Sequence, residues 1–258
     1  MTKILEGKKG LILGVANKRS IAWGIAQSAA DHGAQLAFSY QGERLQENVE
    51  ELANTLKGSL LFPCDVTDEN QVDAMFAGID KEWAGLDFVA HCIAYAKAED
   101  ISGRFVDTKL EGFNTALDVS AFSFTLVTRK AEPLLEKRGG GSILTLTYLG
   151  AQRVMPNYNV MGVAKAALEA STRYLASDLG PKNIRVNAIS AGPVQTLAAR
   201  GITGFVDMYK AAKDKSPLRR NTVPEEVGDA ATFLFSSLSR GITGQVLFVD
   251  SGYNILAF

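Results

Sequence analysis

The chain has 258 residues, of which 47% are hydrophobic and 21% charged, and its 27 Lys and Arg residues nearly balance 28 Asp and Glu residues, for a formal net charge of −1. This composition is that of a globular protein and excludes a disordered chain, a collagen and a small disulfide-stabilised scaffold. The balanced charge gives no sign of a surface for nucleic acid or for an anionic membrane, so neither partner is expected.

The chain also lacks the signals of export and membrane insertion. No apolar run reaches the ~18 residues that a membrane span needs, and the charged N-terminal segment predicts neither a signal peptide nor a transit peptide. Two cysteines, Cys64 and Cys92, are too few for a metal site or a disulfide framework. We therefore expect a soluble cytoplasmic protein with no bound metal.

Short apolar runs alternate with longer segments of helical periodicity along the whole chain. In chain order, the apolar runs predict strands at residues 10–15, 34–40, 59–63, 86–92, 142–147, 183–189 and 245–249. The segments between them predict helices at residues 20–32, 42–57, 69–84, 110–138, 157–179 and 224–238, with a loop-and-helix insert at 196–215.

This alternation favours an α/β fold with one doubly wound, Rossmann-type domain over residues 1–258, in which a parallel seven-stranded sheet carries helices on both faces. The strands are nearly continuous apolar runs, as burial on both faces of a parallel sheet requires. A strand order of 3-2-1-4 is expected around the first strand. Ligands of such sheets bind beyond the carboxyl ends of the strands, so the residues that follow each strand are the candidates for a site.

The turn after the first predicted strand is a candidate site for a dinucleotide pyrophosphate. The segment reads GVANKRSIAWG, from Gly14 to Gly24, and lacks the GxGxxG fingerprint. Gly14 can make the turn, Ser20 can cap the following helix, and Gly24 permits close packing of helix on strand. A purely structural turn with a serine cap explains the same residues, and glycine spacing alone does not decide between the two interpretations.

The ends of the second and third predicted strands point to the adenosine half of the same ligand. NAD sites usually carry an acid about 20 residues after the glycines, where it holds the ribose hydroxyls. Here the neutral Gln41 occupies that place, and Arg44 is the nearest cation that could reach a 2′-phosphate, so we favour NADH over NADPH. Asp65 and Val66 follow the third strand, where the adenine edge is expected, although Asp65 can equally start a turn.

The fourth predicted strand contains a histidine, but it does not indicate a metal or an acid–base site. His91 lies within an apolar run and is expected to be a hydrogen-bonded core residue. Cys64 and Cys92 follow strands that are not neighbours in the expected order, so no disulfide is expected between them. Both are expected to be small buried apolar residues.

Three residues after the fifth predicted strand carry the clearest chemical signal. Tyr148 follows the strand, and Tyr158 and Lys165 lie on the next predicted helix, seven residues apart. Seven residues make nearly two turns, so both side chains leave the same face, roughly 10 Å apart along the axis. A lysine ammonium near a phenol favours the phenolate and strengthens the phenol as a donor. Alternatively, the tyrosines are interface aromatics and the lysine is a surface residue.

Longer blocks of sequence point to a known family. These blocks are GVANKRSIAWG, FSYQ, CDV, TYLGAQRVMPNYNVMGVAK, RVNAISAGPVQTLA and GITGQVLFVDSG. With them, and essentially end to end, the chain resembles the short-chain dehydrogenases/reductases, and within that superfamily the enoyl-acyl-carrier-protein reductases of bacterial type II fatty-acid synthesis.

The spacing of tyrosine and lysine fits this resemblance. Carbonyl-reducing relatives carry YxxxK, but the residue four positions before Lys165 is Met161, which cannot donate a proton. The tyrosine lies a further turn back, at Tyr158, roughly 5 Å along the axis. Enoyl reduction places hydride on C3 while charge develops on the thioester oxygen two carbons away, so the oxyanion donor must stand farther from the hydride.

The resemblance implies NADH-dependent reduction of the C2–C3 double bond of trans-2-enoyl-acyl-carrier-protein thioesters. In this mechanism Tyr158 stabilises the enolate, Lys165 holds the nicotinamide ribose, and Tyr148 lines the acyl site as a candidate second acid. The resemblance further implies acyl carrier protein as a partner, a homotetramer, and a lid over the substrate at residues 196–215, to which Gly201 and Gly204 give backbone freedom.

Carried over position by position, the implied cofactor contacts are Gly14, Ser20, Ile21, Gln41, Asp65, Val66, Ile93, Lys165, Val194, Gln195, Thr196, Leu197 and Ala198. The implied substrate contacts are Ala96, Tyr148 and Tyr158, and the implied catalytic residues are Tyr148, Tyr158 and Lys165. Two other functions stay open. One is a carbonyl or 3-oxoacyl reductase of the same superfamily, against which Met161 argues, and the other is a non-catalytic NAD-binding protein, against which the retained tyrosine and lysine argue.

Overall fold

The computed structural model describes residues 3–197, 199 and 203–256. Within them one sheet holds seven strands, all paired in parallel, in the order β3-β2-β1-β4-β5-β6-β7. The strands are β1 (Lys9–Leu13), β2 (Gln35–Tyr40), β3 (Leu60–Pro63), β4 (Phe88–His91), β5 (Gly141–Thr147), β6 (Ile184–Ala191) and β7 (Val246–Val249). The parallel seven-stranded sheet and the 3-2-1-4 order predicted from the sequence are both confirmed.

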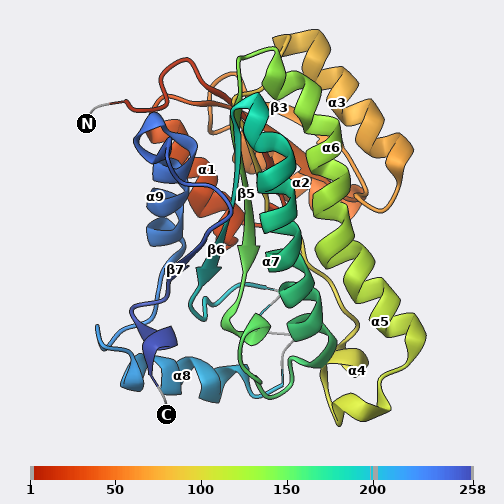
Figure 1. Cartoon of the computed structure of the whole chain (residues 1–258), viewed down its shortest axis with the longest axis vertical. Helices are drawn as coiled ribbons and strands as arrows, with labels where there is room; N and C mark the ends of the chain where they lie inside the picture. The colour runs from red at the N-terminus through yellow and green to blue at the C-terminus, as the bar shows by residue number, and fades with distance from the viewer. Residues whose placement is uncertain (1–2, 198, 200–202, 257–258) are drawn as a thin grey trace.

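Helices cover both faces of the sheet (Figure 1). One face carries α1 (Ile21–Asp31), α2 (Glu43–Ala53) and α9 (Pro224–Phe235), and the other carries α3 (Glu69–Trp83), α6 (Ser123–Glu136) and α7 (Asn159–Leu179). Successive residues of a strand point to opposite faces. Leu11 and Leu13 accordingly pack against the second set of helices, whereas Ile12 packs against the first. Burial on both faces explains why the strands are unbroken apolar runs.

The prediction of one continuous helix over residues 110–138 is wrong, because the α-helix is interrupted near residue 120. The structure has α5 (Leu110–Leu117), a π-helical turn (Asp118–Phe122) and then α6. Inside this turn the Ser120 hydroxyl accepts a hydrogen bond from the Tyr95 backbone N–H at 2.9 Å and donates one to the Tyr95 carbonyl at 3.1 Å. These bonds tie the turn to the loop after β4, and π-helical turns of this kind are frequent at functional sites.

The close packing predicted for Gly24 involves a second helix and not a strand. A Cβ at Gly24 would lie 2.5 Å from the Pro224 carbonyl oxygen. A Cβ at Gly228 would lie 2.4 Å from the Gly24 carbonyl oxygen. The two glycines therefore let α1 and α9 approach backbone to backbone, and a side chain at either position would separate them.

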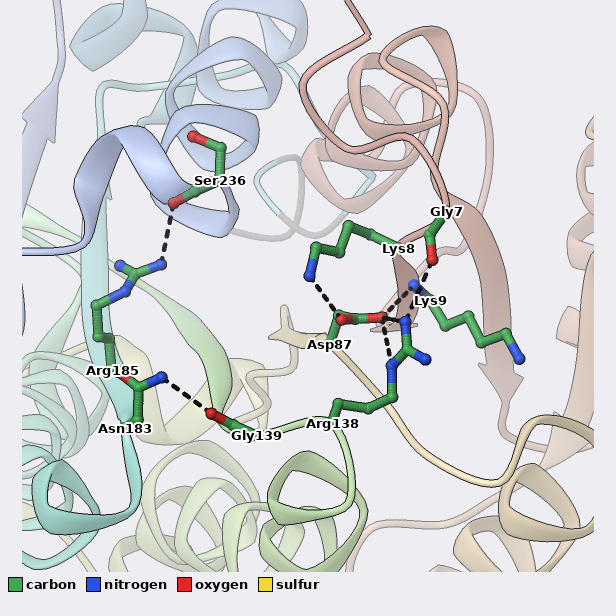
Figure 2. Close-up of polar contacts among 9 residues, drawn as sticks. All are labelled: Gly7, Lys8, Lys9, Asp87, Arg138, Gly139, Asn183, Arg185 and Ser236. Carbon is green, nitrogen blue, oxygen red and sulfur yellow. Dashed lines mark hydrogen bonds and ion pairs between the residues drawn. The ribbon is translucent and has the colours of Figure 1, made fainter.

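The amino end of the sheet holds a buried carboxylate among ionic partners (Figure 2). Asp87, just before β4, is 6% exposed. Its carboxylate accepts hydrogen bonds from the Lys8 ammonium at 2.9 Å, the Lys9 backbone N–H at 2.9 Å and the Arg138 guanidinium at 3.3 Å. This cluster joins the starts of β1 and β4 to the residues that follow α6.

Short helices complete the described part of the chain. They are α4 (Ala98–Ile101), α8 (Phe205–Lys215), η1 (Phe105–Asp107), η3 (Leu149–Ala151), η4 (Gly180–Lys182), η6 (Ser237–Ser239) and η7 (Tyr253–Ile255). Figure 1 shows α4 and α8 at the end of the molecule toward which the arrowheads of β5 and β6 point. Among the described residues, no helix is long and apolar enough to cross a membrane.

Candidate active site

A cavity of about 460 Å³ opens where β4, β5 and β6 end, with further walls from α7 and α8. The predicted site residues that line it are Ile21, Ile93, Ala96, Tyr148, Tyr158, Lys165, Val194, Thr196 and Leu197. Its size is that of a small-molecule site. The cavity thus lies at the edge where a doubly wound sheet is expected to bind its ligand.

The remaining predicted cofactor residues do not line this cavity. They follow β1, β2, β3 and β6 at the same end of the sheet, and they are Gly14, Ser20, Gln41, Asp65, Val66 and Gln195. Ala198 and the predicted lid residue Gly201 lie outside the described residues.

The first turn is tight because two strands end side by side. Gly14 has φ +95°, in the left-handed region, and a Cβ on it would lie 2.2 Å from the Cys92 carbonyl oxygen. The predicted serine cap is wrong, because the Ser20 hydroxyl accepts hydrogen bonds from the N–H groups of Ala16 and Asn17 at 3.1 and 3.0 Å instead. Ser20 therefore closes the loop before α1 and leaves the first N–H groups of that helix without a side-chain cap. Such free N–H groups suit a phosphate.

Gln41 and Asp65 meet beyond the ends of β2 and β3. The Gln41 side-chain amide donates a hydrogen bond to the Asp65 carboxylate at 2.7 Å. The other carboxylate oxygen accepts bonds from the N–H and hydroxyl of Thr67, so Asp65 also starts a turn. Burial alone would raise the pKa of Asp65, but the hydrogen bonds from Thr67 and Gln41 outweigh it and lower the pKa. The pair offers an anionic acceptor and an amide to the hydroxyl and amino groups of a nucleoside.

Tyr148 and Tyr158 meet in the cavity wall, with ring centres 5.1 Å apart and ring planes at 67°. Tyr148 follows β5, and Tyr158 is the residue before α7, which begins at Asn159 and not at residue 157 as predicted. The late start has a local cause, because Asn157 has φ +57°, which no α-helix accommodates. A Cβ at Gly150 would lie 2.5 Å from the Tyr158 ring, so the glycine gives this ring its place beside Tyr148.

The two phenol hydroxyls differ in their partners. The Tyr148 hydroxyl donates a hydrogen bond to the Met208 sulfur of α8 at 3.3 Å, and a thioether is a weak acceptor. In the described part of the chain no hydrogen bond joins the Tyr158 hydroxyl to another residue. Burial raises the pKa of both phenols, and at Tyr158 the neighbouring Tyr148 adds to the rise. Tyr158 is therefore a neutral phenol with its donor available to a ligand.

Lys165 lies deep in the cavity wall and is 5% exposed, which excludes the surface lysine considered above. Its ammonium donates a hydrogen bond to the Leu146 carbonyl at 2.7 Å. Burial lowers the pKa of Lys165 to about 8, although the Cys92 thiol and the Glu169 carboxylate act to raise it. The expected lowering of the Tyr158 pKa by this lysine is wrong, because burial dominates at the phenol and the ammonium binds β5.

The core assignments made for His91 and Cys64 agree with the structure, whereas the expectation of a buried Cys92 is wrong, because this residue is half-buried and lines the cavity. His91 is fully buried, with its Nε2 2.8 Å from the Ser123 hydroxyl. Burial lowers the pKa of His91 to about 3, and the Lys165 ammonium contributes to the lowering, so the imidazole is neutral at physiological pH. Cys64 and Cys92 are free thiols whose pKa burial raises to about 12, and neither is therefore a thiolate nucleophile.

The cavity wall also contains residues that the sequence patterns did not single out. Phe205 and Met208 reach it from α8, and Tyr95 and Ile101 come from the segment after β4. Phe205, Met208 and the buried Ala212 recur at helical spacing, so the apolar periodicity of this short helix was the available signal. No comparable signal marks Tyr95 or Ile101, because their place depends on the path of a loop.

Comparison with known proteins places the chain in a family. A doubly wound sheet with a buried lysine and a tyrosine at its ligand-binding edge is typical of the short-chain dehydrogenases/reductases. Residues 14–254 match the family described as Enoyl-(Acyl carrier protein) reductase, to which the chain belongs. It is 56% identical over 256 residues to the enoyl-acyl-carrier-protein reductase (NADH) of Bacillus cereus, covering 98% of this chain and 99% of that protein. The Bacillus subtilis enzyme of the same name is 54% identical over 255 residues, covering 98% of each.

Solved structures agree with this assignment. The Bacillus cereus enoyl-acyl-carrier-protein reductase, solved with NADP+ and an indole naphthyridinone, superposes with a TM-score of 0.97 at 55% identity over 100% of both chains. The reductase of Anaplasma phagocytophilum, solved with NAD, superposes with a TM-score of 0.96 at 51% identity, covering 100% of this chain and 98% of that one. The predicted Rossmann-type fold is thereby confirmed.

Proposed function

We propose that the chain reduces the C2–C3 double bond of trans-2-enoyl-acyl-carrier-protein thioesters with NADH, in fatty-acid elongation. The observation that carries this proposal is the order of side chains before Lys165. Met161 is apolar and 8% exposed in the cavity wall, and the nearest phenol is Tyr158, a further turn away. A donor displaced in this way suits a thioester oxygen that lies two carbons from the atom receiving hydride.

The residues at the ligand edge of the sheet fit a nicotinamide dinucleotide. The free N–H groups at the start of α1 would hold the pyrophosphate, and Gln41 and Asp65 would hold the adenosine. Lys165 would bind the nicotinamide ribose hydroxyls, and Ile93 with residues 194–197 would enclose the ring. When bound, the reduced nicotinamide supplies the hydride. The preference for NADH is supported by the names of the Bacillus relatives.

Tyr158 acts on the substrate as the oxyanion donor. Because burial raises its pKa, the phenol is neutral and can donate a hydrogen bond to the thioester oxygen. That bond strengthens as hydride reaches C3 and negative charge moves to the oxygen, so it stabilises the enolate more than the substrate. The enolate then takes a proton at C2. Tyr148, whose hydroxyl donates a hydrogen bond to the Met208 sulfur, is the second acid beside the acyl chain, and Ala96 lines the same cavity.

Residues 196–215 form the lid over the substrate in this proposal. In the described part of the segment, Gly204 has φ +77° and precedes α8, from which Phe205 and Met208 enter the cavity wall. Apolar side chains over the enolate exclude water. The Tyr158 hydrogen bond is stronger in that drier surrounding, because less solvent screens it.

Acyl carrier protein is the proposed carrier of the substrate, and further copies of the chain are the proposed partners in a homotetramer. Phe122 and Leu110 are 54% and 74% exposed, and large apolar side chains of this kind are often covered in an assembly. Free thiols at Cys64 and Cys92 support a reducing, cytoplasmic location. Light scattering of the purified protein tests the assembly, and a monomeric mass would overturn it.

Absorbance of NADH with two carrier-protein thioesters tests the reaction itself. We expect crotonyl-acyl-carrier protein to be reduced at least about 100-fold faster, as kcat/KM, than acetoacetyl-acyl-carrier protein. Reduction of the ketone alone would support a carbonyl reductase. Binding of NADH without oxidation by either thioester would support a non-catalytic protein.

A further inference from the structure

Glu169 is a buried carboxylate that the proposed reaction does not use. It lies on α7, one turn after Lys165, and is 7% exposed. Its two oxygens accept hydrogen bonds from the Thr147 hydroxyl at 2.8 Å and the Gln152 side-chain amide at 3.3 Å. None of the ion pairs in the described residues includes it. A buried carboxylate without an ion pair lowers the stability of the fold. Stabilisation of the fold therefore does not explain why a glutamate occupies this position.

We propose that Glu169 is a positioning residue for the reduction, which holds the segment around Tyr148 and places a negative charge one helical turn from Lys165. Thr147 immediately precedes Tyr148, and Gln152 follows it in the loop that leads to Tyr158. The inference rests on the proposed function, in which Tyr148 and Lys165 contact the ligands.

The geometry joins α7 to the strand that carries the site. Lys165 binds the Leu146 carbonyl, and Glu169 binds the next residue of β5, Thr147. Two side chains one helical turn apart therefore hold two consecutive residues of the strand. Because Tyr148 is the following residue, these two hydrogen bonds fix the position of the backbone from which its ring projects.

Two groups in the described part of the chain act to raise the pKa of Lys165, the Cys92 thiol and the Glu169 carboxylate. The ammonium binds the Leu146 carbonyl of β5, and its charge acts on His91 at the end of β4, on Cys92 just after that strand and on Glu169 of α7. Both the imidazole and the thiol are uncharged near neutral pH, since burial lowers the pKa of His91 to about 3 and raises that of Cys92 to about 12. The Glu169 carboxylate therefore acts against the burial that lowers the pKa of Lys165, and so favours the ammonium form that would bind the ribose hydroxyls.

Two substitutions separate the charge from the hydrogen bonds. Glu169→Gln keeps the shape and removes the charge, whereas Glu169→Asp keeps the charge and shortens the reach to Thr147 and Gln152. Asp178→Asn makes the same change of charge at an exposed position of α7 and is the matched control. For each variant, kcat and kcat/KM for crotonyl-acyl-carrier protein are measured between roughly pH 6 and 10 at saturating NADH.

We expect Glu169→Gln to move the alkaline limb of the kcat/KM profile down by roughly 0.5 to 1 pH unit, because the Lys165 pKa falls when the opposite charge is removed. We expect Glu169→Asp to keep the limb in place and to lower kcat roughly tenfold, because the Tyr148 segment is less well held. The Asp178→Asn enzyme should match the unmodified enzyme in both measurements.

A folded Glu169→Gln enzyme with an unmoved alkaline limb would overturn the inference, since a merely structural glutamate predicts only a loss of stability. If that variant does not fold, the Glu169→Asp enzyme decides, and an unchanged kcat would overturn the positioning role. Failure of the proposed function is distinct, because the unmodified enzyme would then not oxidise NADH with the crotonyl thioester at all.

Discussion

Buried charged groups at the two ends of the sheet differ in how many polar partners they have. At the amino end, Asp87 is surrounded by the Lys8 ammonium, the Arg138 guanidinium and a backbone N–H (Figure 2). At the carboxyl end, the Lys165 ammonium is buried against one carbonyl oxygen, and the Tyr158 hydroxyl has no partner in the described residues.

This difference distinguishes polar groups that stabilise the fold from polar groups that are available to bind a ligand. Where a buried charge is fully paired, removal of one member of the pair strongly destabilises the protein. A buried charge with few partners already costs free energy, and such groups are concentrated at functional sites, where a ligand supplies what is missing. The comparison therefore predicts opposite effects on stability for substitutions at the two ends.

Replacement of Asp87 gives the largest expected change in stability. Asp87→Ala leaves Lys8 and Arg138 without their carboxylate, and we expect the free energy of unfolding to fall by about 2–4 kcal/mol. Urea unfolding measures the loss, with Glu51→Ala, an exposed position of α2, as the control. The kcat and the NADH affinity of the folded fraction should not change, and a selective loss of either would break the separation between the two ends.

Replacement of Lys165 should change stability in the other direction. Lowering the pKa of a lysine from 10.5 to about 8 corresponds to about 3 kcal/mol against the charged form. A substitution that removes the charge recovers this free energy but also loses the hydrogen bond to Leu146, which offsets part of the gain. We expect Lys165→Met to raise the unfolding temperature by roughly 2–4 °C while NADH binds roughly 10- to 100-fold more weakly. Calorimetry and fluorescence titration check the two effects, and a destabilised variant would contradict the comparison.

The pH dependence of stability gives a second test of the cost of burying Lys165. Below about pH 8 Lys165 is charged in both the folded and the unfolded chain, so the full penalty applies. Between about pH 8 and 10.5 the unfolded chain binds more protons, so stability relative to Lys165→Met should rise by up to about 1.4 kcal/mol per pH unit. Activity should fall over the same range as the ammonium loses its proton. Unfolding and rate measurements on both proteins across this range test the prediction.

Met208 offers the smallest expected effect. Met208→Leu keeps an apolar side chain of similar size on α8 but removes the sulfur that accepts the Tyr148 hydrogen bond. We expect kcat/KM for the crotonyl thioester to fall by only about two- to threefold, because a thioether contributes a weak bond. A loss of 100-fold or more would assign Tyr148 the larger share of the chemistry.

Most of the sheet was predictable from the sequence, whereas the partners of particular polar groups were not. The strands at β1 and β4 are apolar runs because both of their faces are buried, and a local pattern records that burial. The π-helical turn depends on Ser120 bonding to Tyr95, and the Tyr148 hydroxyl is bound by Met208. These partners lie 25 and 60 positions apart in the chain, so periodicity carries no trace of them. The serine cap failed for a nearer reason, since Ser20 had alternative donors within its own loop.

The neutral phenol of Tyr158 is the centre of the account, and a single-turnover measurement tests it most directly. Enzyme saturated with NADH is mixed with crotonyl-acyl-carrier protein, and the rate of NADH oxidation is compared for the unmodified enzyme, Tyr158→Phe and the exposed control Tyr174→Phe. We expect the Tyr158→Phe rate to fall by roughly 100- to 1,000-fold, as for loss of one oxyanion donor, with NADH affinity unchanged and the control at full rate. A Tyr158→Phe enzyme that turns over at the unmodified rate would contradict the account.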